Sequence, residues 1–539
     1  MAPDAPGYLS LHLNAHLPFV RHPERPSVLE EAWLYAAVTE TYLPLLAVFD
    51  RLAEEEVPFR VSCTLSPTLV AMLRDELLTR RCARHLERLC ELADREVRRT
   101  RSDPVFHGLA LHYRGEFRSL RALFEDRYRR DLVSAFKRLE DAGRLEIVTS
   151  GATHGFLPLL QVHPEAARAQ VSVAVSHHRR HFGRDPKGIW LPECGHYPGV
   201  DALLAEHDLR YFFVDAHGLR DAAPRPRYGV YAPVFTESGP AAFGRDPESS
   251  MEVWSAEHGY PGDPDYREFY RDVGWDLDWA RVKDYAGPAR QRRNLGIKYF
   301  RITGRTAHKE PYHPARARER AAAHARDFLS RRQKQIEYLA SRMGGARPVV
   351  VSPYDAELFG HWWYEGPLFL DFLLRGAASG QRTLRLATPG DYLAENPEQQ
   401  VATPPTCSWG AGGYSGVWLD GSNDWVYRHL HQAAERMVAL ARDFPEPTAL
   451  ERRALNQAAR ELLLAQSSDW AFILKTGTAV DYALRRIREH VLRFTRLFEE
   501  VRARRVDARW LAGVEAKDNL FPEIDYRVYR PRGPGERGP

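Results

Sequence analysis

Short β-like runs alternate with long amphipathic stretches up to Pro405, and this alternation constrains the fold more than any other feature. Strands that alternate with helices form parallel sheets, and the helices pack outside them. The sequence therefore predicts an α/β fold with a closed or nearly closed parallel barrel. The seven runs lie at residues 8–14, 58–66, 144–150, 188–192, 210–215, 347–353 and 382–389.

Two segments depart from this pattern. Residues 216–308 are rich in Gly, Pro, Asp and aromatic residues, which is typical of a loop-rich insertion that covers a binding site. After Pro405 the strand signals stop, and helical stretches follow at 424–442, 448–474 and 479–505. We expect a catalytic barrel over 1–404, a helical C-terminal domain over 405–526 that completes the substrate groove, and a disordered tail over 527–539.

Composition excludes several classes of partner. Lys and Arg number 76 against 72 Asp and Glu, a net charge of +4 over 539 residues. This near balance argues against nucleic acid or a membrane surface as partner. Five cysteines without a C-x-x-C spacing favour a reducing compartment. We find no basic, apolar N-terminal leader and no stretch that approaches a membrane span, so we expect a cytoplasmic protein.

Polar and aromatic residues follow five of the seven predicted strands. In a parallel barrel, the carboxyl ends of the strands meet at one rim, and chemistry takes place there. A single histidine or acid at such a place is usually a loop cap, but five strand ends together favour a site. The candidates are Asn14 and His16, His154, then Trp190, Glu193 and His196, His217, and finally Asp355, His361 and Trp363.

Two of these candidates, Glu193 and Asp355, stand among aromatic residues without a nearby Lys or Arg. Paired carboxylates among aromatic rings suit the cleavage of glycosidic bonds, because the rings stack on the apolar faces of sugars. The alternatives are a buried structural acid for Glu193 and a helix N-cap for Asp355.

No metal or cofactor motif is present in the sequence. The histidines of SHHRRHF (176–182) lie among arginines at helical spacing, so we expect a solvated basic helix face there. There is no H-E-x-x-H and no phosphate-binding glycine loop. We expect neither a metal nor a cofactor.

The C-terminal region adds further candidates. Trp409 lies in a glycine-rich loop, Trp418 follows it, and Asp469 and Trp470 lie in QSSDWAF. They suit either the walls of a substrate groove or packing between domains.

Five short motifs occur in order along the chain, and together they resemble those of glycoside hydrolase family 57. They are AHLP around His16, SGATHGFLP around His154, WLPECG around Glu193, YDAELFGHWW around Asp355 and AQSSDW around Asp469. The resemblance implies a (β/α)7 barrel with an inserted helical subdomain and a C-terminal helical domain. It also implies a retaining double displacement, with Glu193 as nucleophile and Asp355 as general acid/base.

Within that family, SWGAGGYSGVWLD (408–420) and GYPGDPDYREFYRDVG (259–274) resemble the 1,4-α-glucan branching enzymes. The resemblance implies an α-1,4-glucan such as amylose or glycogen as donor and acceptor, and α-1,6 branches as product. We expect a monomer or a homodimer. An amylase, a 4-α-glucanotransferase and a catalytically silent glucan-binding protein remain alternatives, with a metal-dependent polysaccharide deacetylase more distant.

Two departures from the branching enzymes are visible in the sequence. Asn14 occupies the place of the first histidine in H-A-H-L-P, and an amide cannot carry a proton. The loop 238–248 has Phe243 where those enzymes tend to carry a tyrosine over the site. We expect Phe243 to supply a ring wall without the hydroxyl group.

Overall fold

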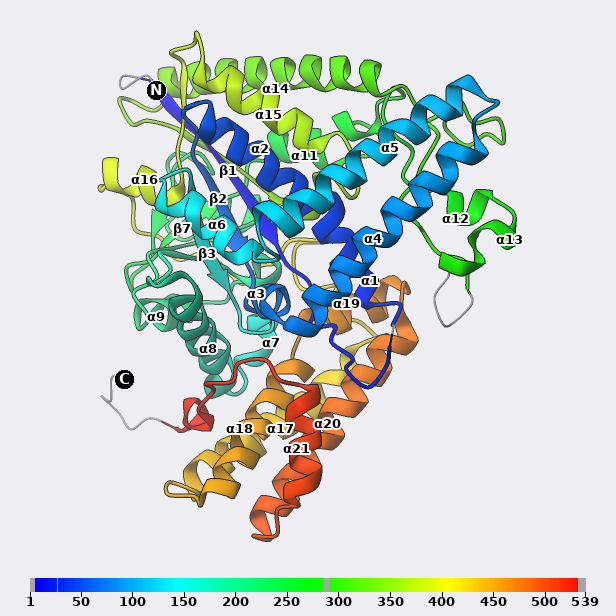
Figure 1. The fold of residues 1–539 in the computed structure, drawn as a ribbon. Coiled ribbons are helices and arrows are strands. Elements are labelled where there is room, and N and C mark those ends of the chain that lie inside the picture. Colours follow the sequence, from blue (N-terminus) through cyan, green and yellow to red (C-terminus); the bar gives the residue numbers. More distant parts are fainter. Residues whose placement is uncertain (1–4, 27, 286–290, 532–539) are drawn as a thin grey trace.

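A curled, mainly parallel sheet forms the centre of the protein. The computed structural model describes residues 5–26, 28–285 and 291–531. The strands follow the order β6-β7-β5-β4-β3-β2-β1-β8, with β9 paired to β1, and among the described strands only the β6–β7 pair is antiparallel. Helices surround the strands labelled in Figure 1. The strands are β1 (Gly7–Ala15), β2 (Val61–Leu65), β3 (Leu145–Ser150), β4 (Gly188–Trp190), β5 (Tyr211–Val214), β6 (Val234–Phe235), β7 (Ala241–Gly244), β8 (Val349–Asp355) and β9 (Leu384–Leu386).

Seven of these strands, β1 to β5, β7 and β8, form the parallel barrel. The chain leaving β7 meets β8 across the remaining gap: the Asp246 N–H donates to the Val351 carbonyl at 2.8 Å. The hydroxyls of Ser249 and Ser352 lie 2.7 Å apart at the same seam. The (β/α)7 barrel is therefore confirmed.

One predicted barrel strand was wrong. The run 382–389 forms β9, which pairs with the start of β1 beside the barrel path. The seventh barrel strand is β7, which lies inside the segment we expected to be a loop over the site. Its sequence, AAFG, has no β-branched residue, so the usual strand signal is absent.

Phe243 is consequently a core residue and not a ring over the substrate. It lies on β7 with no exposed surface, and its ring packs 5.8 Å from Tyr211 and 6.1 Å from Tyr392. The missing hydroxyl at this position thus says nothing about the choice between transfer and hydrolysis.

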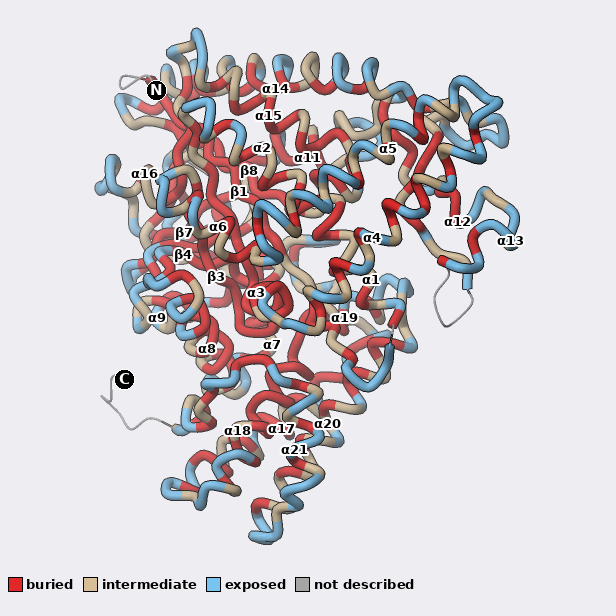
Figure 2. Tube along the Cα trace, in the orientation of Figure 1, coloured by how far each residue is buried: buried red, intermediate tan, exposed pale blue. Residues whose placement is uncertain are grey.

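Helices surround the sheet, and buried residues concentrate in the strands and on the inner helix faces (Figure 2). Helices α4 and α5 form a long hairpin beside the barrel. The helices before the C-terminal region are α1 (Glu31–Ala36), α2 (Leu43–Glu54), α3 (Pro67–Arg74), α4 (Glu76–Arg99), α5 (Pro104–Ala122), α6 (Leu132–Asp141), α7 (Leu157–Leu160), α8 (Pro164–Phe182), α9 (Val200–Ala205), α10 (Ala216–Arg220), α11 (Pro247–Trp254), α12 (Val273–Asp276), α13 (Trp279–Val282), α14 (Pro314–Arg342), α15 (Gly366–Ala378) and α16 (Pro389–Glu395).

One helical stretch, Glu31–Glu54, has the length and apolar composition of a membrane span. This corrects the expectation that no stretch approaches that length. However, 61% of its most apolar part is buried inside the protein, as in the core helix of a globular fold.

The C-terminal region is helical, as predicted, but the expected helix 448–474 is broken in two. The chain breaks at Gln466 and Ser467, and the new helix begins at Ser468, one residue before Asp469. The helices here are α17 (Asp424–Asp443), α18 (Ala449–Ala465), α19 (Ser468–Thr476), α20 (Val480–Arg502) and α21 (Ala508–Lys517). The domain boundary at residue 405 stays a prediction.

The tail that we predicted to be disordered, 527–539, starts too early in the chain. Residues Tyr526–Tyr529 form a short 3-10 turn, η7, and Tyr529 is fully buried. Residues 532–539 of the predicted tail lie outside the described residues.

Two of the three histidines of α8 are buried and not solvated. His177 and His178 are 3% and 2% exposed, and the ring of His177 packs edge-on against Phe521, 5.1 Å away. The segment after α21 therefore covers the face of α8 that the sequence suggested would be basic and solvated.

Candidate active site

Side chains from several strand ends and from the start of α19 meet at one rim of the barrel. Asn14 lies near the end of β1, His16 follows that strand, His154 follows β3, Glu193 follows β4, and Asp355 ends β8. These predicted strand-end residues do lie together, because hydrogen bonds and ring contacts connect them.

Glu193 has a strained backbone. Its φ and ψ are 64° and 24°, and the next residue, Cys194, also has a positive φ of 50°. Left-handed conformations at non-glycine residues cost on the order of 1–3 kcal/mol and cluster at functional sites. The main-chain N–H of Trp409 donates to the Glu193 carbonyl at 2.8 Å, which helps to hold this turn.

The Glu193 carboxylate receives donors on both oxygens. The indole N–H of Trp409 donates to Oε2 at 2.7 Å, and the Ser468 hydroxyl donates to Oε1 at 2.8 Å. His154 Nδ1 lies 3.5 Å from Oε1. Burial alone would raise the pKa of Glu193, but His154, Trp409 and Ser468 together hold it below its usual value. Glu193 is therefore ionised at neutral pH.

The pKa of Asp355 is shifted in the opposite direction, upward. Burial raises its pKa to about 7, the amide of Asn14 opposes the shift by donating to Oδ1 at 3.1 Å, and the charge of Glu193 adds to it. Its side chain makes no N-cap hydrogen bond to the turn that follows, η6 (Ala356–Leu358), which removes the helix-cap alternative. Two acids pushed toward opposite protonation states are the arrangement that acid–base chemistry requires.

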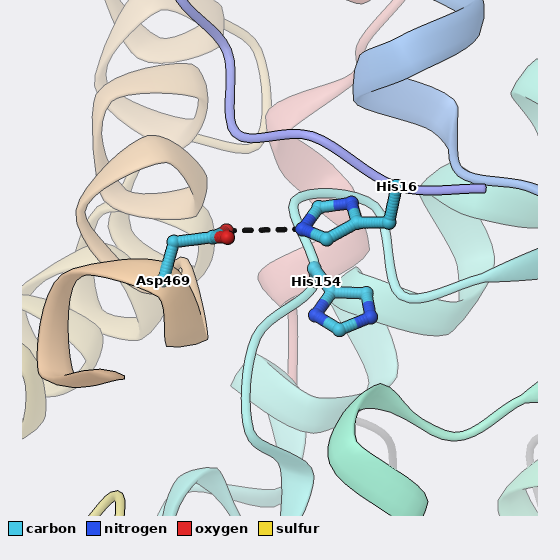
Figure 3. A group of neighbouring side chains, drawn as sticks. All are labelled: His16, His154 and Asp469. Carbon is cyan, nitrogen blue, oxygen red and sulfur yellow. Dashed lines mark hydrogen bonds and ion pairs between the residues drawn. The ribbon is translucent and has the colours of Figure 1, made fainter. Parts of the chain in front are cut away.

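His16, His154 and Asp469 form a compact group (Figure 3), and His154 connects it to Glu193. His16 Nε2 lies 3.0 Å from Asp469 Oδ2, and its ring stacks on that of His154 at 3.7 Å with an angle of 11°. Ligand atoms of the three residues are close enough for a metal ion. However, imidazole nitrogens bind a metal in the plane of the ring, and two stacked, nearly parallel rings share no such point. The prediction of no metal stays a prediction, and the group suits hydrogen bonding to sugar hydroxyls.

Four tryptophans that we expected to bind substrate are core residues instead. Each is at most 2% exposed, so none offers a surface to a sugar: Trp190, Trp363, Trp418 and Trp470. Trp190 packs edge-on against Trp409 at 5.0 Å and thereby supports the residue that holds Glu193. Trp409 itself is half-buried at the site.

The remaining predicted histidines lie in loop contacts. His196 is 1% exposed and binds the Pro405 carbonyl through Nδ1, so the structure contradicts a role in substrate contact. His217 binds the Gly413 carbonyl at 2.8 Å and braces the loop that carries Trp409. His361 is partly exposed and pairs with Glu40 at 2.7 Å.

Three further residues at or near the rim were not among the predicted site residues. Ser468 binds Glu193, and the SSDW motif that contains it was the available signal. Trp362, not its neighbour Trp363, is exposed, at 52%, and stacks on Phe269 at 4.4 Å. Burial raises the pKa of Glu357 to about 8, and the nearby charge of Asp355 adds to that shift.

A barrel whose rim holds two acids with opposed pKa shifts is typical of enzymes that act on glycosidic bonds. Comparison with known proteins identifies the family. The model of glycosyl hydrolase family 57 matches residues 10–405, and the model "1,4-alpha-glucan branching enzyme, C-terminal" matches residues 429–529. The chain belongs to glycosyl hydrolase family 57.

Relatives and solved structures extend over nearly the whole chain. A 1,4-alpha-glucan branching enzyme of Thermococcus kodakarensis is 33% identical over 98% of this chain and 79% of that protein. The α-amylase AmyC of Thermotoga maritima is 44% identical with a TM-score of 0.92, over 99% of this chain and 100% of that one. A family 57 branching enzyme of Pyrococcus horikoshii is 32% identical with a TM-score of 0.88, over 99% and 98%.

Proposed function

We propose that this protein is a retaining 1,4-α-glucan branching enzyme. It cleaves an α-1,4 bond in a donor chain and joins the released segment to an acceptor through an α-1,6 bond. The observation that carries this proposal is the pair of Glu193, held ionised by three neighbours, and Asp355, whose pKa is raised to about 7. The similarity to named branching enzymes over 98% or more of the chain supports the choice of reaction.

In the first half of the reaction, Glu193 attacks the anomeric carbon while protonated Asp355 donates its proton to the leaving glycosidic oxygen. The glycosidic bond breaks, and a bond between the sugar and the Glu193 carboxylate forms. A retaining pair of this kind has its carboxyl groups about 5–5.5 Å apart. Burial of Asp355 keeps the required proton on it near neutral pH.

In the second half, the pKa of Asp355 falls because the esterified Glu193 no longer carries a charge. Asp355 then accepts the proton of the acceptor's 6-hydroxyl, whose oxygen attacks the anomeric carbon and releases Glu193. Water in place of the acceptor would make the protein an amylase, and a 4-hydroxyl would make it a 4-α-glucanotransferase.

The C-terminal region belongs to the catalytic unit in this proposal. Trp409 and Ser468 supply two of the donors to Glu193, and Asp469 binds His16. The groove is then formed by the barrel rim together with residues after 405. The partly exposed Trp409 and the exposed Trp362 are the rings offered to the glucan.

The state of the cysteines is consistent with action on stored glucan in the cytoplasm. All five are buried and free, which suits a reducing compartment. The α-glucan is both donor and acceptor in this proposal, and no nucleic acid or membrane takes part.

The purified protein should be incubated with amylose, and the product treated with an α-1,6-specific debranching enzyme. Short chains that appear only after debranching, with few new reducing ends before it, support branching. Abundant reducing ends without debranchable chains would favour the amylase alternative, which the similarity to AmyC motivates. An unchanged polymer, bound but not converted, would favour a silent glucan-binding protein.

A further inference from the structure

A cavity of about 160 Å³ opens between α1, α4 and the chain after α13, and it uses none of the residues of the catalytic rim. Tyr35 and His85 form one wall, with rings stacked at 5.6 Å. Tyr285 lines another part and is 4% exposed, and its hydroxyl has no partner among the described residues.

The cavity lining is strongly basic. Among the described residues, the lining contains four arginines, Arg81, Arg84, Arg88 and Arg293, and one carboxylate, Glu31. Arg81 already binds both oxygens of Glu31, at 2.6 and 2.8 Å.

The other three arginines have no acidic partner among the described residues. Arg88 donates to the main-chain carbonyl of Asp284 and lies over the Tyr285 ring, 5.6 Å from its centroid, and Arg293 donates to the carbonyl of Tyr285 at 2.7 Å. Arg84 is exposed on the same helix as Arg88. Three guanidinium groups therefore surround one small cavity without a carboxylate to balance them.

The positive charge of the arginines lowers the pKa values of neighbouring groups. Burial lowers the pKa of Arg293, and the charge of Arg88 lowers it further. Burial, followed by Arg293, also lowers the pKa of His85 to about 4. Holding like charges together costs free energy, and an anion bound between them would recover it.

We propose that this cavity binds a small phosphorylated sugar, with the phosphate on Arg84, Arg88 and Arg293 and the sugar ring against Tyr35. Arginine forks match phosphate oxygens in geometry and charge. The cavity is smaller than the roughly 300–1,000 Å³ typical of sites for drug-sized ligands, so a single ring with one phosphate fits it better than a nucleotide.

Isothermal titration of the full-length protein tests this site, with glucose 6-phosphate, inorganic phosphate and glucose as separate probes. Glucose 6-phosphate should bind at one site per chain, inorganic phosphate more weakly, and glucose not measurably. Arg84→Gln and Arg88→Gln should each weaken glucose 6-phosphate binding roughly tenfold, the loss expected for one charged hydrogen bond. Arg98→Gln is the matched control, because Arg98 is exposed on α4 outside the cavity and should leave binding unchanged.

The proposal would be overturned by no binding of glucose 6-phosphate, by equal binding in Arg84→Gln and Arg98→Gln, or by equal binding of glucose and glucose 6-phosphate. The Arg84 side chain is exposed and has no hydrogen bond or ion pair to another described residue, so Arg84→Gln should fold normally. Displacement of glucose 6-phosphate by maltoheptaose would assign the binding to the catalytic groove and would also refute a separate site. The titration requires no turnover, so its result is independent of whether the protein branches glucan.

Discussion

Replacing Trp409 with phenylalanine removes one hydrogen-bond donor from Glu193 and keeps an aromatic ring in place. The indole N–H lies 2.7 Å from Glu193 Oε2, and the Glu193 side chain is only 13% exposed, so water replaces this donor poorly. A hydrogen bond to a charged group contributes about 1.5–3 kcal/mol, and one pKa unit corresponds to about 1.4 kcal/mol. Because Ser468 and His154 remain, we expect the lower end of this range, a rise of about 1 unit in the pKa of Glu193.

The sign of the effect on activity follows from the role of each acid. Glu193 must be ionised to attack, so the acidic limb of the kcat/KM profile reports its pKa. Trp409→Phe should therefore move the acidic limb to higher pH by about 1 unit. The alkaline limb reports loss of the Asp355 proton and should stay near pH 7, because that pKa is raised mainly by burial.

Initial rates on amylose between pH 4 and pH 9 measure both limbs. Trp254→Phe is the matched control: this indole lies 5.9 Å from the Trp409 ring, and its N–H has no partner among the described residues. It should leave both limbs unchanged. An acidic limb that does not move in Trp409→Phe, in a protein of normal stability, would refute the claim that this indole keeps Glu193 ionised.

Three further predictions follow from contacts elsewhere. Asn14→Leu removes the donor that opposes protonation of Asp355, so the alkaline limb of the same profile should move above pH 7, and an unmoved limb would contradict the assignment. Trp190→Ala should lower the free energy of unfolding by about 3–5 kcal/mol in urea titration, because it empties a fully buried site; a loss below 1 kcal/mol would argue against that packing. Burial lowers the pKa of His178 from 6.5 to about 3. Between these two pH values the unfolded chain binds a proton at His178 and the folded chain does not. Stability should thus fall by about 2 kcal/mol from pH 7 to pH 5 through this residue, and His178→Leu should abolish that part of the loss.

Much of the fold and the centre of the site were predictable because both depend on regular patterns. Alternating strands and helices predict a parallel barrel, and a parallel barrel places Glu193 and Asp355 at one rim whatever the details of the loops. The five motifs then connect those positions with His16, His154 and Asp469.

The remaining residues depend on features that a strand or helix pattern does not encode. β7 is four residues long without β-branched side chains, so Phe243 was read as part of a loop. Trp362 and Trp363 are neighbours, and the turn after η6 decides which ring faces solvent. Ser468 reaches Glu193 where the chain breaks between α18 and α19, and at this break the Ser468 N–H donates to the His154 carbonyl at 3.0 Å, a long-range contact that a helix pattern does not encode.

The most direct test of the central claim is to trap the sugar on Glu193. Asp355→Ala can still form a glycosyl-enzyme from α-maltosyl fluoride, since fluoride leaves without a proton, but it lacks the base for the second step. Intact-mass spectrometry followed by peptide mapping should find one maltosyl group per chain, on the peptide that contains Glu193. An adduct on another residue, or full branching activity in Asp355→Ala with no adduct, would contradict the double displacement proposed for this pair.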